Sequence, residues 1–107
     1  MIAGAPAPVF VVVGSGSAGR RHATALHSLL PDVRLVVVRR ATSTQPLDVL
    51  TALGAELVHT VDEAAMLAPS LAVIAGPSTT HAADAAVLLG AGAAVLVEKP
   101  LAASTEA

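Results

Sequence analysis

Two short segments of this 107-residue chain hold the residue types best suited to chemistry. The first is Gly14-Ser15-Gly16-Ser17-Ala18-Gly19, whose glycines have the spacing G-x-G-x-x-G. Between a buried strand and a helix, this spacing gives a tight turn, a close approach of backbone to pyrophosphate and a close strand–helix contact. The helix N-terminus adds N–H donors and partial positive charge. We predict that all six residues bind a dinucleotide, and the alternative is a purely structural turn.

The second segment is Glu98-Lys99-Pro100, which contains the only lysine of the sequence. It follows an apolar run, as does Ala75-Gly76-Pro77, which leads toward His81. Ligands of open parallel sheets bind outside the carboxyl ends of the strands, so both segments are expected beside the glycine loop. Near a nicotinamide, Lys99 can hold a substrate hydroxyl and stabilise negative charge that develops on oxygen during hydride transfer.

The residues after the second apolar run indicate which dinucleotide binds. An NAD site usually has Asp or Glu there, on the ribose 2′-hydroxyl, but this chain has Arg39 and Arg40, followed by Ser43 and Thr44. A guanidinium can bind a 2′-phosphate through paired hydrogen bonds, whereas a carboxylate would repel it. The sequence therefore favours NADP over NAD. The alternative is that both arginines are solvated and that NAD binds without its usual carboxylate.

Strand and helix patterns alternate along the whole chain and must position these residues. The expected strands cover residues 9–13, 35–38, 56–59, 71–75 and 93–97, and the expected helices cover 18–30, 46–54, 60–69 and 80–90. Leu26, Leu29 and Leu30 are expected on one face of the first helix, and Thr60 with Glu63 predicts a capping box. Alternation with short links predicts an α/β fold in three layers, with a five-stranded, mostly parallel sheet and helices on both faces.

Composition excludes several classes of function. Aromatic residues make up 1% of the chain and the net charge is -2, which speaks against nucleic acid as a partner. The chain has no cysteine, and no His, Asp or Glu spacing resembles a metal site. The longest apolar run, residues 85–97, is shorter than the roughly 20 residues of a membrane span. No export signal is apparent, so a cytoplasmic protein without membrane contact is expected.

Three motifs in this order resemble the N-terminal domain of the Gfo/Idh/MocA oxidoreductases. They are the glycine loop with His22 after it, the segment Ala-x-Pro-x-x-x-His that ends at His81, and Glu98-Lys99-Pro100. The resemblance implies a Rossmann domain over residues 1–107, with a core of about 8–101, in an enzyme that transfers hydride between NAD(P) and a sugar, cyclitol or related hydroxyl compound. It implies that Lys99 contacts substrate and that Glu98 and Pro100 shape its loop. Ala75, Gly76, Pro77 and His81 would line the cofactor side, with Gly76 where the family usually has Thr.

The resemblance also implies parts that this sequence does not contain. The family's acid/base residue lies in a C-terminal α/β domain that carries the substrate contacts, and the last strand of the sheet is expected to be missing as well. An apolar fifth strand at the sheet edge would then promote self-association. Two other hypotheses are a non-catalytic dinucleotide-sensing domain and an inactive truncated fragment. For His22 and His81 a packing or hydrogen-bonding role and a cofactor contact are both open, whereas His27 and His59 are expected to be structural or solvent-facing.

Overall fold

The chain folds around one parallel sheet. The computed structural model describes residues 7–40, 43, 47–75 and 80–98. Its strands are β1 (Val9–Val13), β2 (Arg34–Val38), β3 (Glu56–Val58), β4 (Leu71–Ile74) and β5 (Ala94–Val97). They lie in the order β3-β2-β1-β4-β5, and all four neighbouring pairs are parallel. The chain therefore leaves β1 toward one edge and later returns to build the other, which makes the end of β1 the switch point of the sheet.

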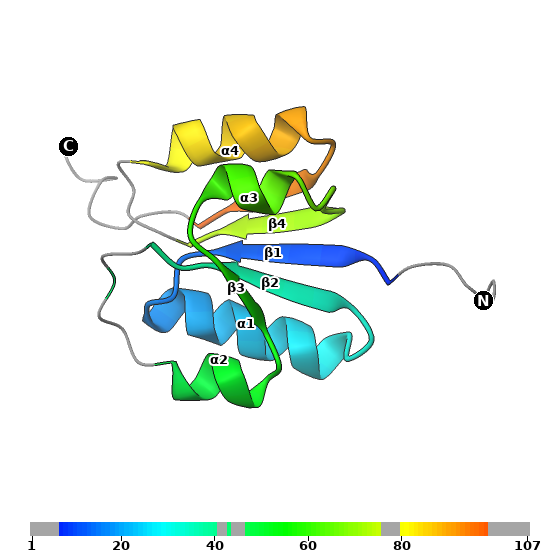
Figure 1. Ribbon diagram of the computed structural model, residues 1–107, viewed down its shortest axis with the longest axis vertical. Coiled ribbons are helices and arrows are strands. Elements are labelled where there is room, and N and C mark those ends of the chain that lie inside the picture. The colour runs from blue at the N-terminus through cyan, green and yellow to red at the C-terminus, as the bar shows by residue number, and fades with distance from the viewer. Residues whose placement is uncertain (1–6, 41–42, 44–46, 76–79, 99–107) are drawn as a thin grey trace.

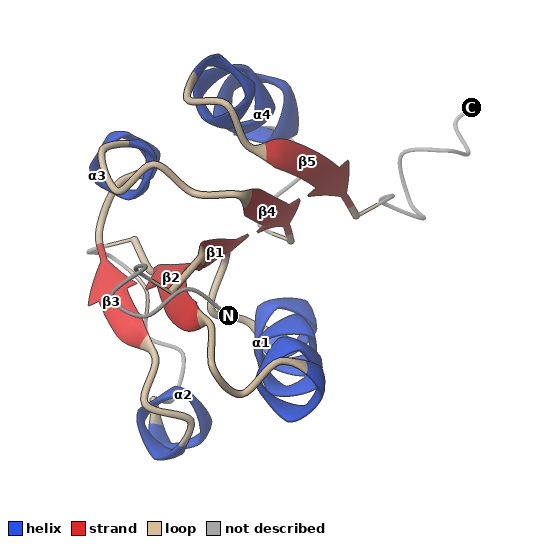
Figure 2. Cartoon of the chain, turned by 90° about the vertical axis from the view of Figure 1, so that its right-hand side faces the viewer, coloured by secondary structure: helices blue, strands red, loops and turns tan. Residues whose placement is uncertain are grey.

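Helices cover both faces of the sheet. They are α1 (Ser17–Leu29), α2 (Asp48–Ala52), α3 (Val61–Ala65) and α4 (His81–Gly90). Figure 1 shows the order of the elements, and Figure 2, along another direction, shows α1 and α2 on one side of the strands and α3 and α4 on the other. The three-layer α/β prediction is confirmed. None of the helices in the described part of the chain is long and apolar enough to span a membrane.

The core has two halves because the central strands are buried on both faces. Val11 and Val13 of β1 belong to the cluster beneath α3 and α4, whereas Val12 belongs to the cluster beneath α1 and α2. All three are at most 1% exposed. A strand with a helix on each side needs apolar side chains at every position, which explains the unbroken run of β1.

Helix α1 differs from the prediction in the face that it buries. Leu29 is 76% exposed and Leu30 is 44% exposed, so the face that the three leucines were expected to share is not the face that the helix buries. Gly19 and Ala23 are the buried residues of α1, and Leu26 packs partly against the same cluster. These three positions follow helical steps of four and three, and Leu29 is rotated away from that line.

The short helix α3 begins with the predicted capping box. The Glu63 backbone N–H donates to Thr60 Oγ1 over 3.1 Å, and the Thr60 N–H donates to Glu63 Oε1 over 3.0 Å. The pKa of Glu63 lies below its ordinary value because the His59 and Thr60 backbone N–H groups donate to its carboxylate. The predicted start of the preceding helix at Pro46 lies outside the described residues, and α2 begins at Asp48.

Candidate functional site

The glycine loop joins β1 to α1 through a turn that requires glycine. Gly14 has a φ of 116°, a conformation that L side chains rarely adopt, and its N–H donates to the Val38 carbonyl over 3.0 Å. A Cβ built at Gly19 would lie 2.0 Å from the Gly14 carbonyl oxygen. The first turn of α1 is therefore pressed against the end of β1. Both glycines are needed by the backbone geometry itself.

Gly16 differs from its two neighbours because the fold itself does not need a glycine there. It is the N-cap of α1 with ordinary dihedral angles, and a Cβ added to it would meet nothing within 4 Å. No side chain of the described residues caps the helix, and its first turn holds no acidic residue. Open space, uncapped N–H groups and a helix dipole are together what a pyrophosphate requires. The residues of this loop therefore fit the phosphates of a dinucleotide.

A chain of polar contacts connects the glycine loop to the segment after β2. The hydroxyls of Ser15 and Ser43 lie 3.3 Å apart, and Ser15 is 5% exposed. Arg39 Nη2 donates to the Ser43 carbonyl over 3.1 Å, and Arg20 Nη1 donates to the Ser15 carbonyl over 3.0 Å. Ser43 and Arg39, both expected near the ribose from the sequence, thus lie beside the loop that is expected to hold the phosphates.

Arg40 reaches in another direction, toward the first turns of α4. Its Nη2 lies 3.2 Å from Asp84 Oδ2 and 3.4 Å from Thr80 Oγ1. Asp84 is only 7% exposed and His81, three residues earlier on the same helix, is 9% exposed. Asp84 was not among the site residues predicted from the sequence. Its spacing from His81 was the available signal, because residues three apart share a helix face.

Glu98 connects the end of β5 to α1. Its backbone N–H continues the ladder to Ile74 over 2.9 Å, and its Oε1 lies 2.5 Å from His22 Nε2. Arg21 Nη2 is 4.0 Å from the other carboxylate oxygen. The pKa of Glu98 lies below its ordinary value, chiefly because its carboxylate accepts a hydrogen bond from His22, and the positive charge of Arg21 adds to the effect. For His22 the structure shows the hydrogen-bonding role.

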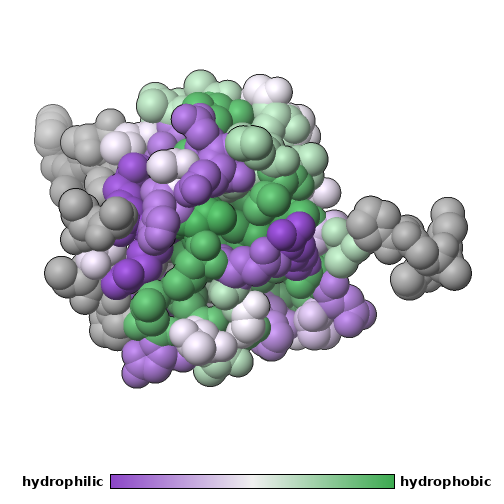
Figure 3. All heavy atoms as spheres, in the orientation of Figure 1, coloured by the Kyte–Doolittle hydropathy of each residue, from purple (hydrophilic) through white to green (hydrophobic). Residues whose placement is uncertain are grey.

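Of the remaining predicted site residues, the structure describes some and not others. The Ala75 backbone N–H donates to the Val13 carbonyl over 2.8 Å, which puts Ala75 beside the glycine loop. Gly76, Pro77, Lys99 and Pro100 lie outside the described residues. Figure 3 shows a band of hydrophilic residues on the side of the molecule to which the strands lead. Among the described residues, no three His, Cys, Asp or Glu side chains gather in a way that could hold a metal ion.

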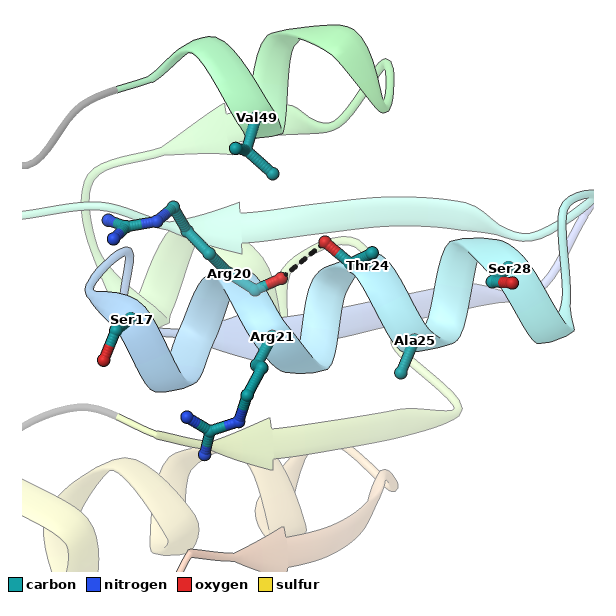
Figure 4. Close-up of a pocket in the computed structure, with 7 residues that line it drawn as sticks. All are labelled: Ser17, Arg20, Arg21, Thr24, Ala25, Ser28 and Val49. Carbon is teal, nitrogen blue, oxygen red and sulfur yellow. Dashed lines mark hydrogen bonds between the residues drawn. The ribbon is translucent and has the colours of Figure 1, made fainter.

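A shallow hollow on the outer side of α1 extends away from this site. Figure 4 shows side chains of α1 around it, with Val49 of α2 above them and a hydrogen bond from the Thr24 hydroxyl to the Arg20 carbonyl. The length of this bond is 2.8 Å. The hollow is lined by Ser17, Arg20, Arg21, Thr24, Ala25, Ser28 and Val49. It is open to solvent and lies along the helix rather than at the strand ends. We therefore place the candidate site at the glycine loop instead.

Comparisons with known proteins agree with this fold. Residues 9–107 match the model of an oxidoreductase family with an NAD-binding Rossmann fold. Among solved structures, GenD2 from gentamicin A biosynthesis, in complex with NAD, is 36% identical in sequence to this chain, with a TM-score of 0.69. The match covers 91% of this chain and 28% of GenD2. A scyllo-inositol dehydrogenase from Lactobacillus casei, with bound NAD(H) and scyllo-inositol, is 29% identical with a TM-score of 0.70 over 89% of this chain and 28% of that one.

A third solved structure extends the same pattern. The UDP-N-acetylglucosamine 3-dehydrogenase GnnA from Acidithiobacillus ferrooxidans is 26% identical with a TM-score of 0.69, over 88% of this chain and 30% of that one. The chain thus spans less than a third of the length of each of these proteins. A search of the curated proteins finds no match.

Proposed function

Because the chain belongs to the Gfo/Idh/MocA oxidoreductase family and is an NAD-binding Rossmann domain of that family, we propose that it serves hydride transfer between a nicotinamide cofactor and a sugar, cyclitol or related hydroxyl compound. The substrate class rests on similar proteins, which include a scyllo-inositol dehydrogenase and a UDP-N-acetylglucosamine 3-dehydrogenase. Substrate contacts and the acid/base residue would come from a second domain. This chain alone is therefore expected to bind the cofactor without turning over substrate.

The geometry of the glycine loop is the main support for this proposal. Gly14 and Gly19 build a turn that brings the N-terminus of α1 to the end of β1, and Gly16 leaves the space before that N-terminus open. The N–H groups of the first turn of α1, with Ser15 and Ser17 beside them, would bind the pyrophosphate. When bound, the nicotinamide accepts or supplies the hydride.

The pair of His22 and Glu98 gives this chain a means of positioning the residue proposed to face the substrate. Lys99 follows Glu98 directly in the sequence, and we propose that its ammonium holds the substrate hydroxyl. The bond of 2.5 Å from His22 fixes Glu98 against α1, the same helix whose N-terminus would bind the pyrophosphate. One rigid element would thus set the cofactor and the start of the lysine segment relative to each other.

We propose NADP as the preferred cofactor, with NAD as the alternative. Arg39 and Arg40 stand where NAD sites usually place a carboxylate, and a guanidinium suits a phosphate dianion. The support is the charge of both side chains and their place just after β2, with Arg39 beside the glycine loop and Arg40 directed toward α4. The known complex of a similar protein, GenD2, holds NAD, so the question needs a direct measurement.

The test is a titration of the chain with NADPH and, separately, with NADH, followed by nicotinamide fluorescence. The chain has neither Trp nor Tyr, so the protein adds almost no background. We expect both to bind and NADPH to bind more tightly. A Gly16→Val variant, which fills the open space, should lose affinity for both. Tighter binding of NADH would refute the proposed cofactor preference, and binding of neither by a folded chain would refute the proposed function.

A further inference from the structure

One carboxylate lies close to Arg40, one of the two cations that are proposed to recognise the cofactor. Asp84 belongs to the first turns of α4, and its side chain is only 10% exposed. Its Oδ2 receives a hydrogen bond of 3.2 Å from Arg40 Nη2, which also lies 3.4 Å from the Thr80 hydroxyl. The Arg40 side chain remains 43% exposed. A buried carboxylate therefore holds a cation whose remaining surface faces solvent.

The contact bridges two segments that are far apart in the sequence. Arg40 is the second residue after β2, and α4 follows β4, so the pair joins segments from the two sides of β1. In a dinucleotide-binding fold, the residues just after β2 are the ones that meet the adenosine ribose. One of the two cations available there for a 2′-phosphate, Arg40, is thus already paired with an anion from α4.

We propose that Asp84 limits the preference of this chain for NADP over NAD by pairing with Arg40, an inference that rests on the proposed function. A 2′-phosphate must share Arg40 with the Asp84 carboxylate or displace it, and displacement would leave a buried charge without its partner. The carboxylate also repels the phosphate dianion through a medium of low dielectric constant. A neutral 2′-hydroxyl experiences neither effect. Asp84 therefore lowers the affinity for NADPH and leaves that for NADH nearly unchanged.

The variant that tests this inference is Asp84→Asn, which keeps the shape and a hydrogen-bond acceptor but removes the charge. The ratio of the NADH to the NADPH dissociation constant, from fluorescence titration of the chain, should rise on the order of tenfold, mostly through tighter NADPH binding. Thermal unfolding followed by circular dichroism shows whether the variant is folded. If it is not, Asp84→Ser, which keeps a hydroxyl in the first turn of α4, carries the same expectation.

A matched control removes an equal charge elsewhere. Glu56 pairs with Arg34 over 2.5 Å at the amino ends of β3 and β2, the opposite edge of the sheet. Glu56→Gln changes the net charge as Asp84→Asn does and should leave the ratio unchanged. In an Arg40→Gln background, Asp84→Asn should raise the ratio less than in the natural chain, because no guanidinium is released.

The role of Asp84 and the proposed function are refuted by different results of these titrations. A rise in the ratio for Asp84→Asn alone supports the inference. An unchanged ratio, or an equal rise for Glu56→Gln, overturns it while cofactor binding stands. Weaker NADPH binding also overturns it, since Asp84 would then orient Arg40 toward the phosphate. If the natural chain and all variants bind neither cofactor, the proposed function falls and this inference falls with it.

Discussion

Replacing Gly19 by alanine tests the close contact at the heart of the glycine loop. The added Cβ would lie 2.0 Å from the carbonyl oxygen and 2.7 Å from the carbonyl carbon of Gly14. Both atoms belong to the backbone, so no side chain can rotate to make room. The turn after β1 and the first turn of α1 must therefore separate.

Two opposing effects determine the size of the loss. Overpacking a well-packed site costs about 1–3 kcal/mol, and a rigid backbone neighbour places this site near the upper end. Alanine is favoured over glycine inside a helix by about 1 kcal/mol. The net loss is then about 2 kcal/mol in the free energy of unfolding. For a domain of this size it lowers the melting temperature by roughly 8–16 °C.

Thermal and urea unfolding by circular dichroism measure this loss, and two glycine variants serve as controls. Gly90→Ala places the same methyl group in α4 where nothing lies within 4 Å, and it should not destabilise the chain. Gly16→Ala should cost less than about 1 kcal/mol, as expected of an N-cap, while weakening cofactor binding. If Gly19→Ala is as stable as the natural chain, the reasoning from the contact with Gly14 is wrong.

Three further predictions concern a charge, a helix cap and the sheet edge. The pKa of Glu98 is lowered in the folded chain from an ordinary 4.5, so the stability that its ionisation contributes is present above that value and is lost as pH falls through the folded pKa. In urea unfolding, Glu98→Gln should therefore be less stable than the natural chain at neutral pH and equally stable in acid. A difference in stability that persists in acid would contradict this. Thr60→Ala removes the cap of α3 and should cost about 1 kcal/mol in thermal unfolding, whereas Thr24→Ala, on the exposed side of α1, should cost much less. Leu96 is 57% exposed on the edge strand β5, so the chain should self-associate at high concentration in sedimentation experiments. Leu96→Lys should reduce this self-association. A natural chain that stays monomeric would show the expectation to be wrong.

The sequence was sufficient to predict the sheet because the relevant signals are local. The all-apolar run of β1 requires cover on both faces, and the Thr60–Glu63 spacing predicts a helix start that the structure confirms. The face of α1 was harder to predict. Leu29 is apolar but exposed, since the closest contact of the helix is set by Gly19, a residue without a side chain.

The pairs within the candidate site could not be predicted in the same way. His22 and Glu98 are 76 residues apart, and Arg40 and Asp84 are 44 apart. The order of the strands brings such residues to one edge, but which partners meet depends on the side-chain directions at each element's end. His22, Glu98 and Arg40 were each predicted from the sequence but not as partners, and Asp84 belongs to no recognisable motif.

We propose above all that this chain binds a nicotinamide dinucleotide at the glycine loop. Two-dimensional NMR of the 15N-labelled chain during titration with NADPH measures where the cofactor binds, independently of any catalysis. We expect the largest amide shift changes from Gly14 to Gly19 and at Arg39 and Arg40, with Glu56 at the amino end of β3 unaffected. Spectra that do not change, or changes confined to the amino ends of the strands, would contradict it.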